Sequence, residues 1–204
     1  MQKFGILLLA AGQSRRFGAD KLLASMPDGR PVIAHSLEPL QAFADAHKLP
    51  LCVVTRADNA ALVEYLKQQK VPFTLCPDAQ LGMGNSIAHG VKSNPSWSGW
   101  MITLADMPNL NQPLLEDLFR TIKEHEQDIV RPKIVTKDSV IPTHPVYFPS
   151  SYANKLIQLS GDNGAKHIIQ QVRWLAVEDA SRFIDVDTPN ALQSLYRQKK
   201  ERNS

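Results

Sequence analysis

The sequence has little of what would place it in several common protein classes. Its 204 residues include two cysteines, Cys52 and Cys76, too few for a disulfide framework or a four-ligand zinc site. We expect both to be buried thiols in a reducing compartment. The apolar run from Phe4 to Ala11 is too short to cross a membrane and lacks a signal-peptide cleavage pattern. These absences predict a cytoplasmic protein with no membrane partner.

The net charge is also small, because 23 basic residues are nearly balanced by 20 acidic ones. A net charge of +3 is too small for a nucleic-acid footprint, so we expect no nucleic-acid partner. The six histidines show no H-E-x-x-H spacing. Neither G-x-x-x-x-G-K-[ST] nor G-x-G-x-x-G is present, which disfavours a Walker ATPase and an ordinary Rossmann dehydrogenase.

An ordinary globular composition is present instead, with 43% hydrophobic and 21% charged residues, and it predicts one domain over residues 1–204. Apolar runs alternate with amphipathic segments as β-α-β-α-β-α-β before a mixed C-terminal part. This pattern predicts a mostly parallel sheet covered by helices. Strands are expected at 4–9, 51–55, 73–76, 100–105, 128–134, 140–148 and 174–177. Helices are expected at 31–46 (with a kink or break at Pro39), 58–69, 84–92, 112–125, 150–159, 163–171 and from Thr188 onward.

A basic, glycine-containing loop follows the first expected strand. Gly12 and Gly18 allow the backbone to turn tightly and approach a ligand. Successive loop amides can face anionic oxygens, and Arg15, Arg16 and Lys21 add three cations. Ligands of such sheets bind where strands end and helices begin. We therefore interpret this loop as a cradle for a polyphosphate.

Acidic residues follow two other expected strands. Asp106 ends a buried apolar run, where a carboxylate is costly unless it is paired or binds a metal. Mg²⁺ takes one or two carboxylates together with phosphate oxygens and water, and Asp106 suits that use, with a helix cap as the alternative. Asp185 and Asp187 would point the same way on a strand. Asp187 is explained equally well as a second metal ligand or as part of a helix cap.

Two further regions are candidate substrate contacts. The loop that holds Gly82 and Ser86 carries no cation, so it suits a neutral group such as a nucleobase or a sugar. His144 at a strand entrance, with Asp162 and Lys166 in a glycine-bounded loop, is a candidate for binding a second, anionic substrate. Structural turns are the alternative for both regions.

Taken together, these motifs resemble the MobA-like nucleotidyltransferase family. The matching segments are collinear and cover nearly the whole chain, at 9–21, 82–86, 104–108, 144–148, 161–165 and 185–189. The first of them reads Leu-Ala-Ala-Gly, as in the branch that transfers cytidylyl groups to the molybdenum cofactor, whereas the guanylyl branch carries Leu-Ala-Gly-Gly. One departure is Thr143, which precedes His-Pro where a glycine is usual.

The resemblance implies a three-layer α/β/α fold of the nucleotide-diphospho-sugar transferase type. It has a Rossmann-like, mostly parallel sheet of about seven strands and a small antiparallel addition. It also implies Mg²⁺-dependent transfer of CMP from CTP to the phosphate of a molybdopterin-type cofactor, with release of pyrophosphate. A phosphate nucleophile is already ionised near neutral pH, so no catalytic histidine set is required. A molybdoenzyme or its chaperone is the macromolecular partner that this activity suggests.

The resemblance assigns roles to individual positions. Nucleotide binding falls to Ala10, Ala11, Gly12, Arg15, Arg16, Lys21, Gly82 and Ser86. Catalysis falls to Arg16, Lys21 and Asp106, and magnesium binding to Asp106 with Asp187. Three alternatives remain: the same chemistry with another phosphorylated acceptor or with GTP or ATP, a non-catalytic carrier or insertion chaperone for a pterin cofactor, and a redox activity. The presence of both Lys21 and Asp106 argues against the carrier, which needs no metal.

Overall fold

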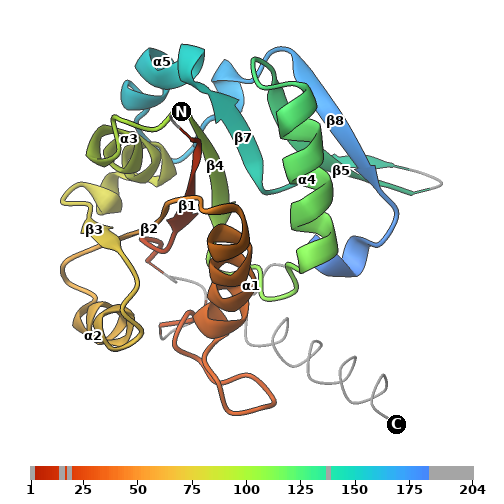
Figure 1. Cartoon of the computed structure of the whole chain (residues 1–204). Helices are drawn as coiled ribbons and strands as arrows, with labels where there is room; N and C mark the ends of the chain where they lie inside the picture. The colour runs from red at the N-terminus through yellow and green to blue at the C-terminus, as the bar shows by residue number, and fades with distance from the viewer. Residues whose placement is uncertain (1–2, 14–16, 18–19, 137–138, 184–204) are drawn as a thin grey trace, which may run out of the picture.

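The computed structural model describes residues 3–13, 17, 20–136 and 139–183 (Figure 1). The predictions for Arg15, Arg16, Asp185 and Asp187, and the expected helix from Thr188, lie outside the described residues.

All eight described strands belong to one sheet, in the order β3-β2-β1-β4-β7-β5-β6, with β8 paired to β5. Their bounds are β1 Gly5–Leu9, β2 Leu51–Thr55, β3 Phe73–Leu75, β4 Gly99–Leu104, β5 Ile129–Val135, β6 Val140–Pro142, β7 Val146–Pro149 and β8 Val172–Val177. The strands β1 to β4 pair in parallel, β8 pairs in parallel with β5, and β6 and β7 run antiparallel to their partners. The predicted mostly parallel α/β sheet with an antiparallel addition is confirmed.

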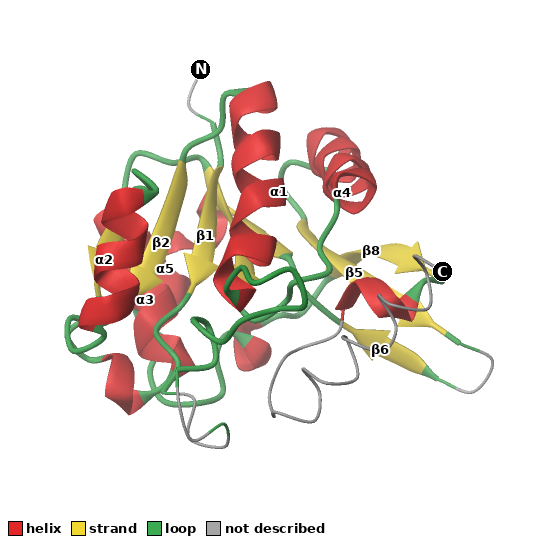
Figure 2. Ribbon diagram, turned by 90° about the horizontal axis from the view of Figure 1, so that it is seen from below, coloured by secondary structure: helices red, strands yellow, loops and turns green. Residues whose placement is uncertain are grey.

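Helices cover both faces of the sheet, as three layers require (Figures 1 and 2). Their bounds are α1 Val32–His47, α2 Ala60–Gln68, α3 Met83–Ser93, α4 Gln112–Glu124 and α5 Ala153–Ile157. Side chains alternate along β1, so Ile6 and Leu8 pack with α1, α2 and α4, whereas Leu7 and Leu9 pack with α3 and α5. No helix among the described residues has the length and apolarity needed to span a membrane.

One expected strand is divided in two. Residues 140–148 form β6 and β7, which both pair with β5. Ile134 pairs with Ile141 on β6, and Val130 pairs with Tyr147 on β7. The two paired positions are four residues apart on β5 but six residues apart on the segment that holds β6 and β7. The two extra residues form a bulge between β6 and β7, where Pro145 has no N–H for the ladder. The peptide bond before Pro145 is cis.

Two helix predictions also differ from the structure. The helix expected at 163–171 is wrong, because only a single 3₁₀ turn forms there, at Lys166–Ile168, and β8 already begins at Val172. Gly161 and Gly164 adopt positive φ angles of 69° and 55°, which turns rather than helices require. The kink or break expected at Pro39 does not interrupt α1. The carbonyl of Pro39 accepts a hydrogen bond from the Gln112 side chain at 2.7 Å.

Candidate active site

A cavity of about 450 Å³ opens at the carboxyl ends of β1 and β4. Its walls come from the loop after β1, the start of α3 and the residues after β4. The lining residues are Leu9, Ala10, Ala11, Gly12, Gln13, Lys21, Leu22, Ala79, Gln80, Gly82, Met83, Ser86, Leu104, Asp106 and Asp162.

Most predicted site residues that the structure describes meet in this cavity. They are Ala10, Ala11, Gly12, Lys21, Gly82, Ser86, Asp106 and Asp162. His144 and Lys166 are not among its lining residues. The roles of all these residues remain predictions, since the cavity shows their placement alone.

Lys21 and Asp106 form the charged centre of the cavity, although 85 positions separate them in sequence. The Lys21 Nζ donates a hydrogen bond to Asp106 Oδ2, and their side chains are 13% and 16% exposed. The second carboxylate oxygen, Asp106 Oδ1, is buried and has no hydrogen-bond partner in the described part of the chain. A buried carboxylate oxygen without a partner is costly unless a ligand satisfies it.

That oxygen suits a hard divalent cation. Mg²⁺ is usually held by one or two carboxylates, with waters and substrate phosphates completing its coordination. Within the described residues, no group of three or more histidine, cysteine or acidic side chains is arranged to hold a metal. Asp106 would therefore be the carboxylate that holds the ion, with phosphate oxygens and water as further ligands.

The position of Asp106 is fixed by a contact that the sequence analysis missed. Ser36 on α1 is fully buried, and its Oγ donates to the carbonyl of Ala105 at 2.7 Å. The Ala105 amide in turn donates to the carbonyl of Leu9 at 3.0 Å. A serine on the apolar face of a helix was the available signal, because a buried hydroxyl needs a partner.

A second missed residue, Asn59, holds the end of the basic loop. Its Oδ1 caps α2 by accepting from the Leu62 amide at 3.1 Å, and its Nδ2 donates to Asp20 Oδ2 at 2.6 Å. The other oxygen of Asp20 accepts from the Leu22 amide at 3.0 Å. The residue directly before Lys21 is thus tied to the start of α2.

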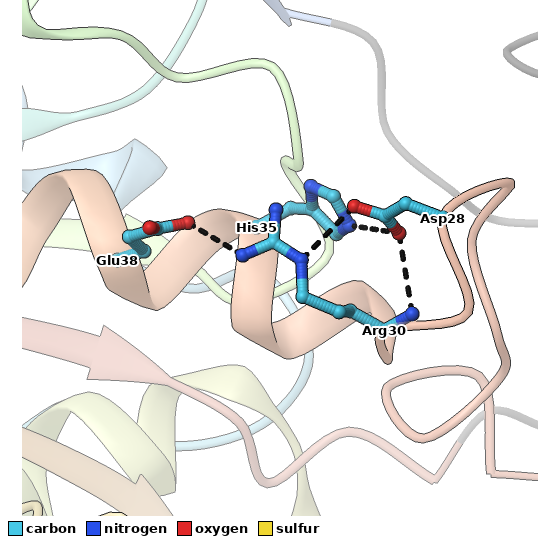
Figure 3. A network of polar contacts seen from close by, with 4 residues as sticks. All are labelled: Asp28, Arg30, His35 and Glu38. Carbon is cyan, nitrogen blue, oxygen red and sulfur yellow. Dashed lines mark hydrogen bonds and ion pairs between the residues drawn. The ribbon is translucent and has the colours of Figure 1, made fainter.

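A polar network fixes the turn that follows the basic loop (Figure 3). Asp28 accepts from the Arg30 backbone and side chain and lies 3.1 Å from His35 Nε2, while Arg30 also donates to Glu38 at 2.8 Å. Burial acts to raise the pKa of Asp28, but the bonds from Arg30 and His35 outweigh it, so this pKa lies well below its usual value.

The Gly82 loop and the loop at residues 160–162 contact each other through their backbones. The Gly84 amide donates to the Gly161 carbonyl at 2.8 Å, and the Gly161 amide donates to Asn85 Oδ1 at 2.9 Å. Gly82 has a φ of 123°, and a Cβ there would lie 2.4 Å from the Gly161 carbonyl carbon. Two motifs that are far apart in sequence therefore form one wall of the cavity. Gly12, in contrast, has space for a Cβ, since no atom of the described residues would lie within 4 Å of it.

A smaller hollow of about 270 Å³ adjoins the cavity on the side of β2 and β3. Both hollows are lined by Gln13 and Gln80. In the smaller one, Arg56 pairs with Asp58 at 3.4 Å, and its buried Nε has no hydrogen-bond partner within the described residues. The cavity therefore has a polar extension on the side away from Asp106.

The predicted acceptor residue His144 lies across β4 from the cavity. Its Nδ1 is 3.5 Å from the carbonyl of Ile102. Burial, with the positive charges of Arg131 and Lys166, lowers the pKa of His144 to about 4. His144 is therefore neutral at pH 7 and does not supply a positive charge for an anionic substrate.

Comparison with known proteins places these features in a family. The model described as "MobA-like NTP transferase domain" matches residues 6–177. The purine catabolism protein PucB of Bacillus subtilis is 28% identical over 94% of this chain and 95% of its own length. A probable molybdenum cofactor guanylyltransferase of Rhodopirellula baltica is 28% identical over 69% of this chain and 66% of its own length.

Solved structures share the fold. The crystal structure of Rv0371c from Mycobacterium tuberculosis superposes with a TM-score of 0.78 at 22% identity, over 97% of this chain and all of that one. A complex of Rv0371c with manganese gives a TM-score of 0.73 at 21% identity, over 97% of this chain and 99% of that one. At such identities, the likeness shows the fold alone.

Proposed function

The chain belongs to the MobA-like NTP transferase family, and from this premise we propose that it transfers CMP from CTP to the phosphate of a molybdopterin-type cofactor and releases pyrophosphate. The observation that carries the proposal is the Lys21–Asp106 pair, in which one buried carboxylate oxygen has no partner among the described residues. The pair lies inside a cavity lined by the predicted nucleotide residues that the structure describes. A cytoplasmic setting and a molybdoenzyme or its chaperone as the recipient are part of the same proposal.

In the proposed reaction, an oxygen of the acceptor phosphate attacks the α-phosphorus of CTP. A new P–O bond forms while the bond from the α-phosphorus to the bridging oxygen breaks, and pyrophosphate leaves with the electron pair. Positioning and charge neutralisation supply most of the catalysis in such transfers. Lys21 and Arg16 would neutralise the departing pyrophosphate, and Ala10, Ala11 and Gly12 would hold the nucleotide.

Asp106 would hold a divalent ion, for which Mg²⁺ is our proposal, with Asp187 as a candidate second ligand. When bound, the ion supplies Lewis-acid stabilisation of charge on the phosphate oxygens. The manganese complex of Rv0371c supports the use of a divalent metal on this fold. Ser36 contributes from outside the cavity by fixing the backbone that carries Asp106.

The identity of the base is the least constrained part of the proposal. Ala11 gives the first loop the form seen in the cytidylyl branch, whereas the Rhodopirellula baltica relative is named as a guanylyltransferase. GTP is therefore the second candidate nucleotide. We expect Ala11→Gly to shift the ratio of kcat/KM for CTP and GTP toward GTP.

The direct test supplies CTP, GTP or ATP with Mg²⁺, in the presence and absence of molybdopterin, and measures pyrophosphate and the product mass. CTP-dependent pyrophosphate release that requires molybdopterin, with a product heavier by CMP, is the expected result. Turnover with a simple sugar phosphate in place of molybdopterin would contradict the acceptor. Tight pterin binding without pyrophosphate release would favour the carrier alternative.

A further inference from the structure

Arg131 on β5 differs from the other described arginines, because it forms no ion pair with a carboxylate of the described residues. Arg30, Arg56, Arg120 and Arg173 each place a guanidinium nitrogen 2.8–3.4 Å from a carboxylate oxygen. Among the arginines whose side chains the structure describes, Arg131 is the one that forms no ion pair with a described carboxylate. Its Nε donates to the Thr143 carbonyl at 2.9 Å, which fixes the guanidinium beside His144.

The setting of Arg131 favours an anionic ligand. The side chain is half-buried, and burial lowers the pKa of Arg131 because no neighbouring carboxylate compensates for the lost water. The neighbouring His144 is neutral at pH 7, and Lys166 adds a second positive charge near it. A partly desolvated guanidinium without a counter-ion matches a phosphate, which it can bind through two parallel hydrogen bonds.

An exposed aromatic ring lies next to Arg131. In the parallel pair β5 and β8, Arg131 is the register partner of Trp174, so both side chains lie on the same face of the sheet. Trp174 is 41% exposed, whereas Trp100 is buried. The Lys133 Nζ lies 5.7 Å from the centre of the Trp174 ring. Apolar exposure of this size beside cations is typical of a stacking surface for a planar anionic molecule.

Side-chain alternation places this surface on the same face as the nucleotide cavity. Ile129 belongs to the core beneath α3 and α5, and Arg131 follows it by two positions on β5. Gly82 and Ser86, which line the cavity, lie at the start of α3 on that face. Across the sheet the order is Trp174 on β8, Arg131 on β5, His144 before β7 and Asp106 after β4.

We propose that Arg131 and Trp174 form the acceptor site, in which the guanidinium binds a phosphate monoester and the indole stacks on a planar heterocycle attached to it. Because Arg131 lies between Trp174 and Asp106 in the order across the sheet, the phosphate of the ligand would lie nearer to Asp106 than its heterocycle does. The proposal deepens the proposed function by naming the residues and the substrate class. Its chemical purpose depends on that function, but the binding itself does not.

The test uses flavin mononucleotide as the probe, because it joins a planar heterocycle to a phosphate monoester and is fluorescent. Full-length protein is titrated into the flavin, and quenching gives the dissociation constant. We expect saturable binding, with riboflavin and ribose 5-phosphate each binding roughly tenfold more weakly or worse. Arg131→Gln should weaken flavin mononucleotide binding by about tenfold or more and leave riboflavin binding nearly unchanged.

The matched control is Arg173→Gln. Arg173 lies next to Trp174 on β8, but its register partner is Val130, which belongs to the core beneath α1, α2 and α4. Its guanidinium forms an ion pair with Asp128. The Arg173→Gln variant should bind flavin mononucleotide with the same dissociation constant as the wild type. Trp174→Ala should weaken binding by about tenfold and remove most of the quenching, and Trp174→Phe should restore part of the affinity. Thermal unfolding checks that each variant folds.

Four results would overturn the proposal: no binding of flavin mononucleotide by the folded wild type at millimolar concentration, unchanged binding in Arg131→Gln, unchanged binding in Trp174→Ala, or an equal loss in Arg173→Gln. Failure of the proposed function is a separate result. It shows as absent CTP-dependent pyrophosphate release while flavin mononucleotide binding still depends on Arg131 and Trp174.

Discussion

The two halves of the sheet differ in how firmly they hold their functional residues. Every residue of β1 and β2 is buried. Ser36 holds the backbone that follows β4, and Asn59 ties the loop after β1 to the start of α2. On the other half, all three residues of β6 are exposed and no residue of β8 is fully buried. Figure 2 shows β5, β6 and β8 on the side of the sheet opposite to β2 and α2.

This contrast matches a division of labour. The chemistry at a triphosphate needs fixed positions, because small displacements of reacting groups reduce the rate strongly. Recognition of an acceptor needs a surface that fits one molecule, and an open sheet face can change its side chains without disturbing the core. The proposed nucleotide half, formed by β1 to β4, should therefore tolerate substitution poorly. The proposed acceptor half, formed by β5 to β8, should change specificity before it loses stability.

The largest effect should come from the charged centre of the nucleotide half. Asp106→Asn removes the negative charge that faces Lys21 and the proposed ion, and we expect nucleotidyl transfer to fall by about 10²–10³-fold or more. Pyrophosphate release measures the rate, and thermal unfolding checks the fold. Asp117→Asn, which alters an exposed ion pair on α4, is the control. Transfer within a few-fold of wild type would exclude a metal-binding role for Asp106.

A substitution at Gly82, where the Gly82 loop contacts the loop at residues 160–162, should give the next largest effect, here on stability. Gly82→Ala places a methyl group against the Gly161 backbone at a φ of 123°, so both strain and overpacking oppose it. We expect a loss of about 2–4 kcal/mol in the free energy of unfolding, measured with urea. Gly29→Ala is the control, because Gly29 has a φ of 81° but a Cβ there would meet no atom of the described residues within 4 Å. Equal losses in the two variants would show that backbone strain alone is responsible.

On the acceptor half, His144 should make stability depend on pH. The folded-state pKa of about 4 lies below the unfolded value near 6.5, so the unfolded chain binds the proton first as the pH falls. Stability should therefore be complete above about pH 6.5 and decline toward pH 4, by at most about 1.4 kcal/mol per pH unit.

The check on His144 is urea unfolding of wild type and His144→Gln between pH 4 and 7.5. The variant should lose part of this slope while the remaining groups still titrate. A wild-type curve identical to that of His144→Gln would mean that His144 titrates alike in the folded and unfolded chains.

The smallest effect compares two helix caps. Asn59→Ala and Asn111→Ala each remove the side-chain acceptor that caps a helix, and each should lower the free energy of unfolding by about 1 kcal/mol. Only Asn59 also holds Asp20, beside Lys21. We therefore expect Asn59→Ala alone to raise the KM for the nucleotide several-fold. Equal KM values in the two variants would show that the contact with Asp20 does not position the basic loop.

Much of the nucleotide half could be predicted from the sequence because β1, β2 and β4 are buried along nearly their whole length and appear as continuous apolar runs. That pattern, with the rule that ligands bind at carboxyl strand ends, predicted that Lys21 and Asp106 would lie at one edge. It did not predict their direct pairing, nor the contacts of Ser36 and Asn59, because these depend on tertiary packing between distant segments.

The acceptor half was harder to predict for a physical reason. β6 has only three residues, all of them exposed, so the pattern at 140–148 did not reveal the bulge before Pro145. The segment 163–171 has helical spacing, but its flanking glycines form turns. Arg131 was missed because one charged residue in an expected strand is ordinarily a solvated one. Its distinction is the lack of a carboxylate partner, which only the folded arrangement of charges makes visible.

The pairing of β5 with three other strands has a consequence for folding during translation. This strand pairs with β6, β7 and β8, and its β8 partners are numbered 43 positions later, as in Ile129 with Val172. Pairings that join such remote positions form slowly. While a ribosome is still adding the residues of β8, one edge of β5 has no neighbour, and the nascent chain presents an open ladder to other chains. The nascent chain should therefore need protection by a chaperone until β8 has been synthesised.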